Sequence, residues 1–141
     1  MLKTKCLLLL EALLFLLIAR LLLGLVPVPR LVGLLSRPLC GATETSSPVQ
    51  DQAIASVHDA ILWVWRRGWL RDRCFHRAIA AHLMLRRRNI PTRFHYGAAT
   101  LPERGLTGHV WLTAGETFVV GGDQASRYRH LFDWGQQHPD Q

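Results

Sequence analysis

Two side chains have the types and the spacing of a thiol nucleophile and its base. Cys74 opens an apolar, periodic stretch that predicts a helix, and His109 follows thirty-five positions later in a run that predicts a strand. The positive end of a helix and a neighbouring imidazole both activate a thiol. Asp123 follows the next predicted strand and is placed to orient the imidazole. The order predicts a Cys-His-Asp site, although a buried core cysteine and an ordinary strand histidine would give the same pattern.

Neighbouring residues suggest how such a site would work. The backbone N–H of Cys74, exposed at a helix start, is the expected oxyanion donor, and the sequence indicates no second donor. Trp111 lies two positions after His109, so it faces the same side of the strand and either shields the histidine or fills the core. A group of arginines near the nucleophile would attract an acidic peptide and favour the thiolate, or form a solvated basic face: Arg66, Arg67, Arg71, Arg73 and Arg77.

The cysteines predict neither a disulfide framework nor a metal site. The chain has three cysteines, an odd number, and they lie in unrelated stretches of sequence: Cys6, Cys40 and Cys74. Reduced thiols are therefore the simplest assumption. Cys74, His76 and His82 have a C-x-H-x5-H spacing. On a helix, however, positions 74 and 76 point about 200° apart and cannot share one tetrahedral ion. We therefore expect no metal and no cofactor.

The charge of the chain favours an anionic partner. Lysine and arginine outnumber aspartate and glutamate by 17 to 10, which gives a net charge of +7. An acidic peptide, a membrane surface or nucleic acid would each fit. Trp63, Trp65 and Trp69 alternate with aliphatic residues, which predicts core positions and not a stacking surface for single-stranded nucleic acid. We therefore expect no nucleic-acid partner.

The first part of the chain is much more apolar than the rest. Residues 6–26 are almost all aliphatic or aromatic, apart from Glu11, Arg20 and a glycine. A spanning helix, a signal peptide and a helix buried against the domain or lying on a membrane surface are three interpretations. The two charges favour the third. Pro27 and Pro29 predict the end of this helix.

The remaining chain divides into helices followed by strands. We expect an apolar helical segment at 1–40, a linker at 41–50 and a domain at 51–141, with helices ending at Gly68 and near Asn89. Strands are predicted at 92–98, 107–113 and 117–120, with a loop at 101–105 and a tight hairpin at 114–116. Residues 128–134 form a short apolar tail. This order predicts an α+β fold with a small antiparallel sheet.

The motifs together resemble a known superfamily. Residues 73–91, with Cys74 at their start and basic residues at their end, resemble the cysteine helix of transglutaminase-like (papain-like) thiol proteases. The narrower resemblance is to the B proteins of lasso-peptide biosynthesis, in their stand-alone protease form. It rests on residues 108–112 and 119–122, Tyr128, Leu131, Glu11-Ala12, Arg20 and residues 27–30.

This resemblance implies a cytoplasmic cysteine protease that removes the leader peptide from a ribosomally made precursor. A partner cyclase then closes the macrolactam, and a separate leader-binding protein presents the precursor. The catalytic residues would be Cys74, His109 and Asp123, although many relatives carry their aspartate where this chain has Gly121. Association with a membrane through the apolar helix is an additional expectation.

Two other functions fit the same residues. An acyltransferase or transglutaminase would use the Cys74 thiol with an amine as acceptor in place of water. A non-catalytic scaffold in a membrane-associated peptide-maturation complex would keep the fold without using the thiol.

Overall fold

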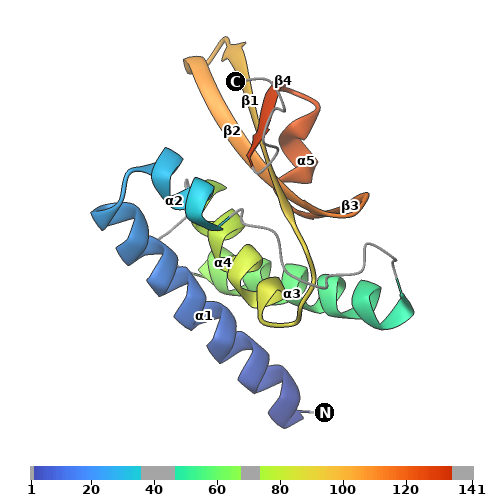
Figure 1. Ribbon diagram of the computed structural model, residues 1–141. Coiled ribbons are helices and arrows are strands. Elements are labelled where there is room, and N and C mark those ends of the chain that lie inside the picture. The colour runs from blue at the N-terminus through green and yellow to red at the C-terminus, as the bar shows by residue number, and fades with distance from the viewer. Residues whose placement is uncertain (1, 36–46, 68–73, 135–141) are drawn as a thin grey trace.

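The computed structural model describes residues 2–35, 47–67 and 74–134, and these form helices followed by an antiparallel sheet (Figure 1). The helices are α1 (Leu2–Leu25), α2 (Val28–Leu35), α3 (Pro48–Arg67), α4 (Cys74–Arg86) and the short α5 (Gly122–Ala125). The strands are β1 (Arg93–Leu101), β2 (Gly105–Ala114), β3 (Thr117–Val120) and β4 (Arg129–Trp134). The α+β architecture expected from the sequence is therefore present.

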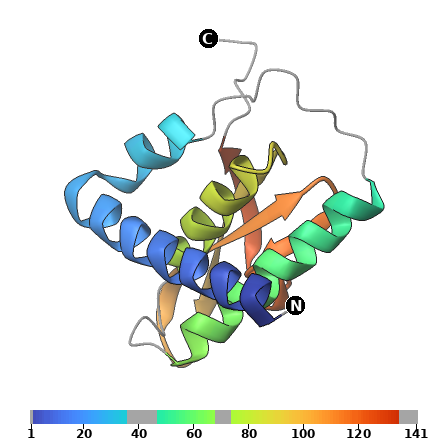
Figure 2. The ribbon, with the colours of Figure 1, turned by 90° about the horizontal axis from the view of Figure 1, so that it is seen from below.

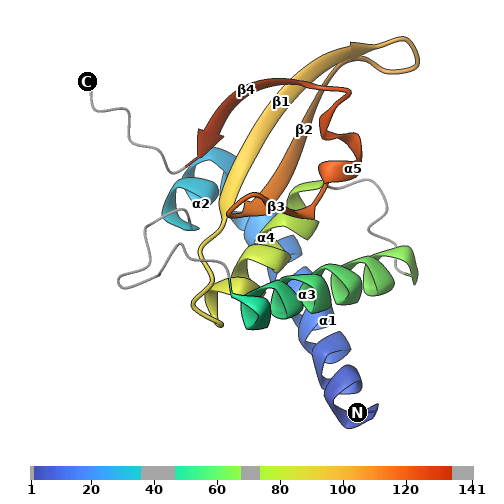
Figure 3. The same cartoon turned by 90° about the vertical axis from the view of Figure 1, so that its right-hand side faces the viewer.

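Helix α4 is the centre of the helical layer. It is buried on almost every side, because α1 and α3 pack against it and the sheet covers it from above (Figure 3). Small residues permit this close approach: Ala78, Ala80 and Ala81 are all fully buried. The helix ends at Arg86, and Asn89 in the turn that follows has a φ of 55°, the left-handed conformation expected before Pro91.

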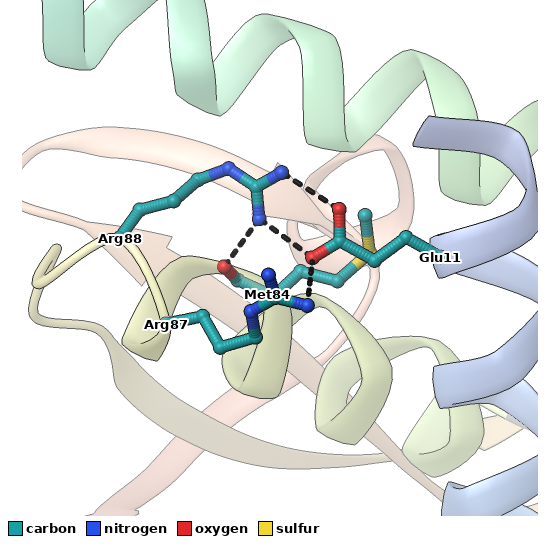
Figure 4. A network of polar contacts seen from close by, with 4 residues as sticks. All are labelled: Glu11, Met84, Arg87 and Arg88. Carbon is teal, nitrogen blue, oxygen red and sulfur yellow. Dashed lines mark hydrogen bonds and ion pairs between the residues drawn. The ribbon is translucent and has the colours of Figure 1, made fainter. Parts of the chain in front are cut away.

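Helix α1 is joined to the turn after α4 by a charged contact in an apolar setting. The Glu11 carboxylate accepts hydrogen bonds of 2.9 and 2.8 Å from the two terminal nitrogens of Arg88, and Arg87 lies at 3.5 Å (Figure 4). Arg88 also donates to the Met84 carbonyl at 2.7 Å. This network connects residues 77 positions apart, so it fixes how α1 lies across the helical layer (Figure 2).

One face of α1 therefore packs on the domain, as the third interpretation predicted. Ala12, Leu16 and Ala19 are completely buried there. The opposite face exposes a series of leucines, Leu7, Leu10, Leu13, Leu14, Leu17 and Leu21. By length and composition alone, α1 is also a helix that could cross a membrane. Pro27 follows its end, and Pro29 occupies the first turn of α2, where proline is tolerated.

The segments expected as separate units are in contact. The helix of the 1–40 segment packs against α3 and α4, which belong to the 51–141 domain. Helix α3 begins at Pro48, inside the linker expected at 41–50. Residues 36–46 and 68–73 lie outside the described part of the chain, so Cys40, Gly68, Trp69, Arg71 and Arg73 are not placed.

The prediction that the tryptophans of α3 are core residues is wrong for Trp63. Its side chain is 46% exposed, and the Arg67 guanidinium lies 3.9 Å from the centre of its ring. Trp65 is half-buried, with Arg77 stacked over it at 4.1 Å. The apolar stripe of α3 faces the core through Ile54, Val57 and Ile61, and Trp63 lies off that stripe.

The sheet has the strand order β3-β2-β1-β4, and all neighbours are antiparallel. The long hairpin of β1 and β2 extends further than the strands predicted at 92–98 and 107–113, so the loop expected at 101–105 shrinks to residues 102–104. The tail expected at 128–134 is edge strand β4, which the sequence did not predict as a strand. Gly115, with φ of 57°, begins the tight turn between β2 and β3.

The two faces of the sheet differ in chemistry. Phe94, Val110 and Leu112 belong to the hydrophobic core shared with the helices. Because successive side chains alternate across a strand, the opposite side carries a group of polar and aromatic residues. We call this the histidine face; it consists of His95, His109, Trp111, Thr113, His130 and Asp133.

Candidate active site

Cys74 lies where the sequence placed it, at the first residue of α4. It is half-buried and packs against the edge of the core. Arg77 follows one turn later on the same helix, and its side chain is buried against the ring of Trp65. A thiolate at Cys74 would thus have both the positive end of a helix and a buried cation beside it.

His109 is buried in β2 and its ring is held on several sides. Its Nε2 lies 2.8 Å from the carbonyl oxygen of Gly121. A carbonyl can only accept, so Nε2 carries the hydrogen and Nδ1 keeps a free lone pair. Tyr128 and Trp111 stack on the ring, at centroid separations of 4.9 and 6.0 Å. These contacts therefore fix the orientation of the ring, with Nδ1 as the nitrogen that can accept a proton when the ring is neutral.

Gly121 is the residue that orients the His109 ring. Its φ is 79°, a left-handed conformation that glycine adopts without strain. A Cβ atom at this position would lie 2.8 Å from the Val110 carbonyl oxygen and 3.2 Å from His109 Nε2. A side chain here would push the carbonyl away from the imidazole, so the hydrogen bond depends on glycine.

Asp123 follows β3 as predicted but does not hold the ring directly. It lies in α5 with its side chain exposed, and no hydrogen bond joins it to His109 within the described residues. It acts through its charge, which raises the pKa of His109 and that of Arg77. Its place as the third catalytic residue stays a prediction.

Charge interactions connect four side chains of the candidate site: Cys74, Arg77, His109 and Asp123. Burial lowers the pKa of His109, the hydrogen bond to Gly121 opposes this, and the charge of Arg77 lowers the pKa further. Burial also lowers the pKa of Arg77, against the attraction of Asp123 and Cys74. Among the described residues, Cys74 and His109 are linked by this shared cation and not by a direct hydrogen bond.

This arrangement can perform acyl transfer through sulfur. The thiol, the neutral imidazole and the helix N–H are the groups that such a reaction needs. The sequence predicted Cys74 and His109 as site residues but did not indicate the Gly121 carbonyl, because a backbone acceptor has no residue type of its own. The glycine pair at 121–122 was the only signal for it. Arg77 was one of five candidate arginines; Arg66 and Arg67 are exposed, and Arg77 alone of these three is buried.

The comparisons with known proteins yield one match. The family model of the transglutaminase-like superfamily matches residues 13–133, from the middle of α1 to the end of β4. The curated proteins and the solved structures yield no match. The match covers both Cys74 and His109 and confirms the expected fold class.

Proposed function

Because the chain belongs to the transglutaminase-like superfamily, we propose that it is a cysteine peptidase that removes the leader peptide from a lasso-peptide precursor. Superfamily membership indicates thiol-dependent protease or transglutaminase chemistry. The observation that carries the proposal is the pairing of a cysteine at the start of α4 with a neutral, oriented His109 across the buried charge of Arg77.

In the proposed reaction, His109 Nδ1 accepts the proton of the Cys74 thiol as the sulfur attacks the scissile carbonyl. The backbone N–H of Cys74 donates to the developing oxyanion at the helix start. The imidazolium returns the proton to the leaving amine, which departs as the freed core peptide. Water, deprotonated by His109, then hydrolyses the thioester and releases the leader acid and the Cys74 thiol.

The choice of substrate rests on the lasso-type motifs of residues 108–112 and 119–122 and on the charge of the chain. An acidic leader would be attracted by the net charge of +7. In this proposal a separate leader-binding protein presents the precursor and raises its effective concentration, and a cyclase consumes the freed amine. If an amine attacked the Cys74 thioester in place of water, the reaction would be acyl transfer and not hydrolysis.

Location at the cytoplasmic side of a membrane is part of the same proposal. The exposed leucines of α1 form an apolar face, and Lys3, Lys5 and Arg20 lie on the same helix. Such a helix can lie in a membrane interface while its other face stays packed on the domain. Cosedimentation of the purified protein with anionic lipid vesicles tests this placement, and a protein that stays in the supernatant contradicts it.

The decisive experiment combines the protein, a candidate precursor and its leader-binding protein, with the products weighed by mass spectrometry. Cys74→Ala and His109→Ala should each lower the cleavage rate by several orders of magnitude, because nucleophile and base act as a unit. Omitting the leader-binding protein should also lower the rate of the unsubstituted enzyme strongly.

Cys6→Ala is the matched control, because this second thiol is exposed on α1, away from the site. The Cys6→Ala protein should cleave the precursor at the same rate as the unsubstituted protein. Near-normal cleavage by the Cys74→Ala protein would end the thiol-peptidase hypothesis. Transfer of the acyl group to an added amine, with little hydrolysis, would replace it with the acyltransferase alternative.

A further inference from the structure

A second cluster of titratable side chains lies on the histidine face, beside Trp111, whose ring also stacks on His109. Asp133 Oδ1 lies 2.6 Å from His95 Nδ1 and 2.6 Å from His130 Nε2. The ring of Trp111 stacks on His95, at a centroid separation of 5.7 Å with the planes 13° apart. Two imidazoles and one carboxylate thus converge on a single point.

A β-bulge creates this convergence. His130 and Asp133 are three positions apart, so in a regular strand they would face opposite sides of the sheet. The pairing of β4 with β1 shifts between Tyr96 and Gly97: Phe132 lies opposite Tyr96, but His130 lies opposite Gly97. Leu131 is the extra residue, and it turns His130 to the same face as Asp133.

We propose that His95, His130 and Asp133 bind a zinc ion. Their donor atoms all lie within 4.8 Å of one another. Tetrahedral zinc with bonds of about 2.0–2.1 Å requires donor separations of roughly 3.3 Å, so small side-chain movements suffice. Imidazole nitrogens with one carboxylate oxygen are a ligand set that zinc accepts.

The surroundings of the cluster support a metal site. His95 Nε2 lies 2.8 Å from Thr113 Oγ1, so the ring can donate its hydrogen there and present Nδ1 to an ion.

The three side chains of the cluster differ in their exposure to solvent. The side chains of His95 and Asp133 are 16% exposed, whereas that of His130 is 48% exposed. Three protein ligands and one solvent-facing position are the pattern of a zinc site that keeps a place for water or a substrate group. Bound zinc would tie edge strand β4 to β1 and fix Trp111 beside His109.

The test titrates zinc into metal-free protein by calorimetry and follows the thermal midpoint. Thiols also bind zinc, so all arms carry Cys6→Ala, Cys40→Ala and Cys74→Ala. One zinc ion per chain should bind and raise the midpoint. Cobalt in place of zinc should give the visible absorption of four-coordinate nitrogen and oxygen ligation.

Asp133→Asn and His130→Ala should each weaken zinc binding at least tenfold and remove the rise in the midpoint. His130 is half-exposed, so its replacement is the variant whose folding is safest. Glu116→Gln, a carboxylate in the β2–β3 turn, is the matched control and should bind as before. Absence of zinc binding by the unsubstituted cluster would overturn the proposal, and so would His130→Ala and Asp133→Asn proteins that bind zinc as tightly as the protein with the cluster intact.

Discussion

Two buried histidines, His82 in the helical layer and His109 on the histidine face, have lowered pKa values for the same first reason, burial. In His82 the charge of Arg86 adds to this effect, and the pKa falls to about 4. Its ring lies against Phe94, and its Nδ1 is 2.6 Å from Thr92 Oγ1. His109 has instead the Gly121 carbonyl on one nitrogen and a free lone pair on the other.

The difference teaches which buried histidine can act as a base. Burial disfavours the protonated ring in both histidines. His109, however, interacts with Arg77, which also interacts with Cys74, whereas His82 is surrounded by core side chains. A perturbed pKa therefore does not identify a functional site by itself. Substitutions of His82 and its core neighbours should change stability, whereas substitutions of Cys74 or on the histidine face should change activity or binding.

His82 should make the fold sensitive to acid. The folded protein disfavours the protonated ring, so its contribution to stability is complete above the unfolded-state pKa of 6.5 and is lost as pH falls towards about 4. This difference corresponds to about 3 kcal/mol. Urea unfolding at a series of pH values should show the loss in the original protein and a much flatter dependence in His82→Leu.

The His82→Leu protein should retain its cleavage rate at neutral pH. An unchanged pH dependence of stability in this variant would show that another group senses acid. Loss of cleavage with the fold intact would contradict this distinction between the two histidines, because it would give His82 a part in the chemistry.

The Glu11–Arg88 contact should contribute to stability without contributing to activity. The Glu11 and Arg88 side chains are 12% and 30% exposed, so Arg88→Ala should cost about 2 kcal/mol, between the values for exposed and buried pairs. Arg88 holds the pKa of Glu11 below 4.5 despite partial burial, so the contact is lost only as pH falls below that value. Urea unfolding measures the cost.

Arg87→Ala is the matched control for that prediction. Arg87 contacts the same carboxylate at 3.5 Å but is 66% exposed, so its loss should change stability by less than about 0.5 kcal/mol. Equal effects of the two arginines would mean that the hydrogen-bond geometry of Arg88 carries no extra stability.

The two regions also differ in how far the sequence predicts them. Helical periodicity placed α3 and α4, the Asn89 cap and Cys74 at a helix start, because these features follow from local patterns. The tail at 128–134 has a bulge at Leu131 that breaks the alternation of a strand, so β4 was not predicted. The zinc ligands come from β1 and β4, and only that pairing brings His95 to Asp133.

The Gly121 carbonyl was unpredictable for a related reason. A glycine at position 121 shows only that a left-handed backbone conformation is permitted there. The hydrogen bond from His109 to its carbonyl forms because β3 pairs with β2, which brings the turn between β3 and α5 next to His109. The sequence placed Asp123 near the site, but exposure and charge, not position along the chain, decide what it does there.

Asp123→Asn is expected to have the smallest effect. The carboxylate raises the pKa of His109 through its charge alone, so its removal should lower that pKa and move the acid limb of kcat/KM to lower pH. An exposed charge contributes below about 1 kcal/mol, so kcat/KM at neutral pH should fall about two- to fivefold. A loss of a thousandfold or more would show that Asp123 replaces the Gly121 carbonyl as the partner of His109 during turnover. An acid limb that moves to higher pH would exclude any stabilisation of the imidazolium by this carboxylate.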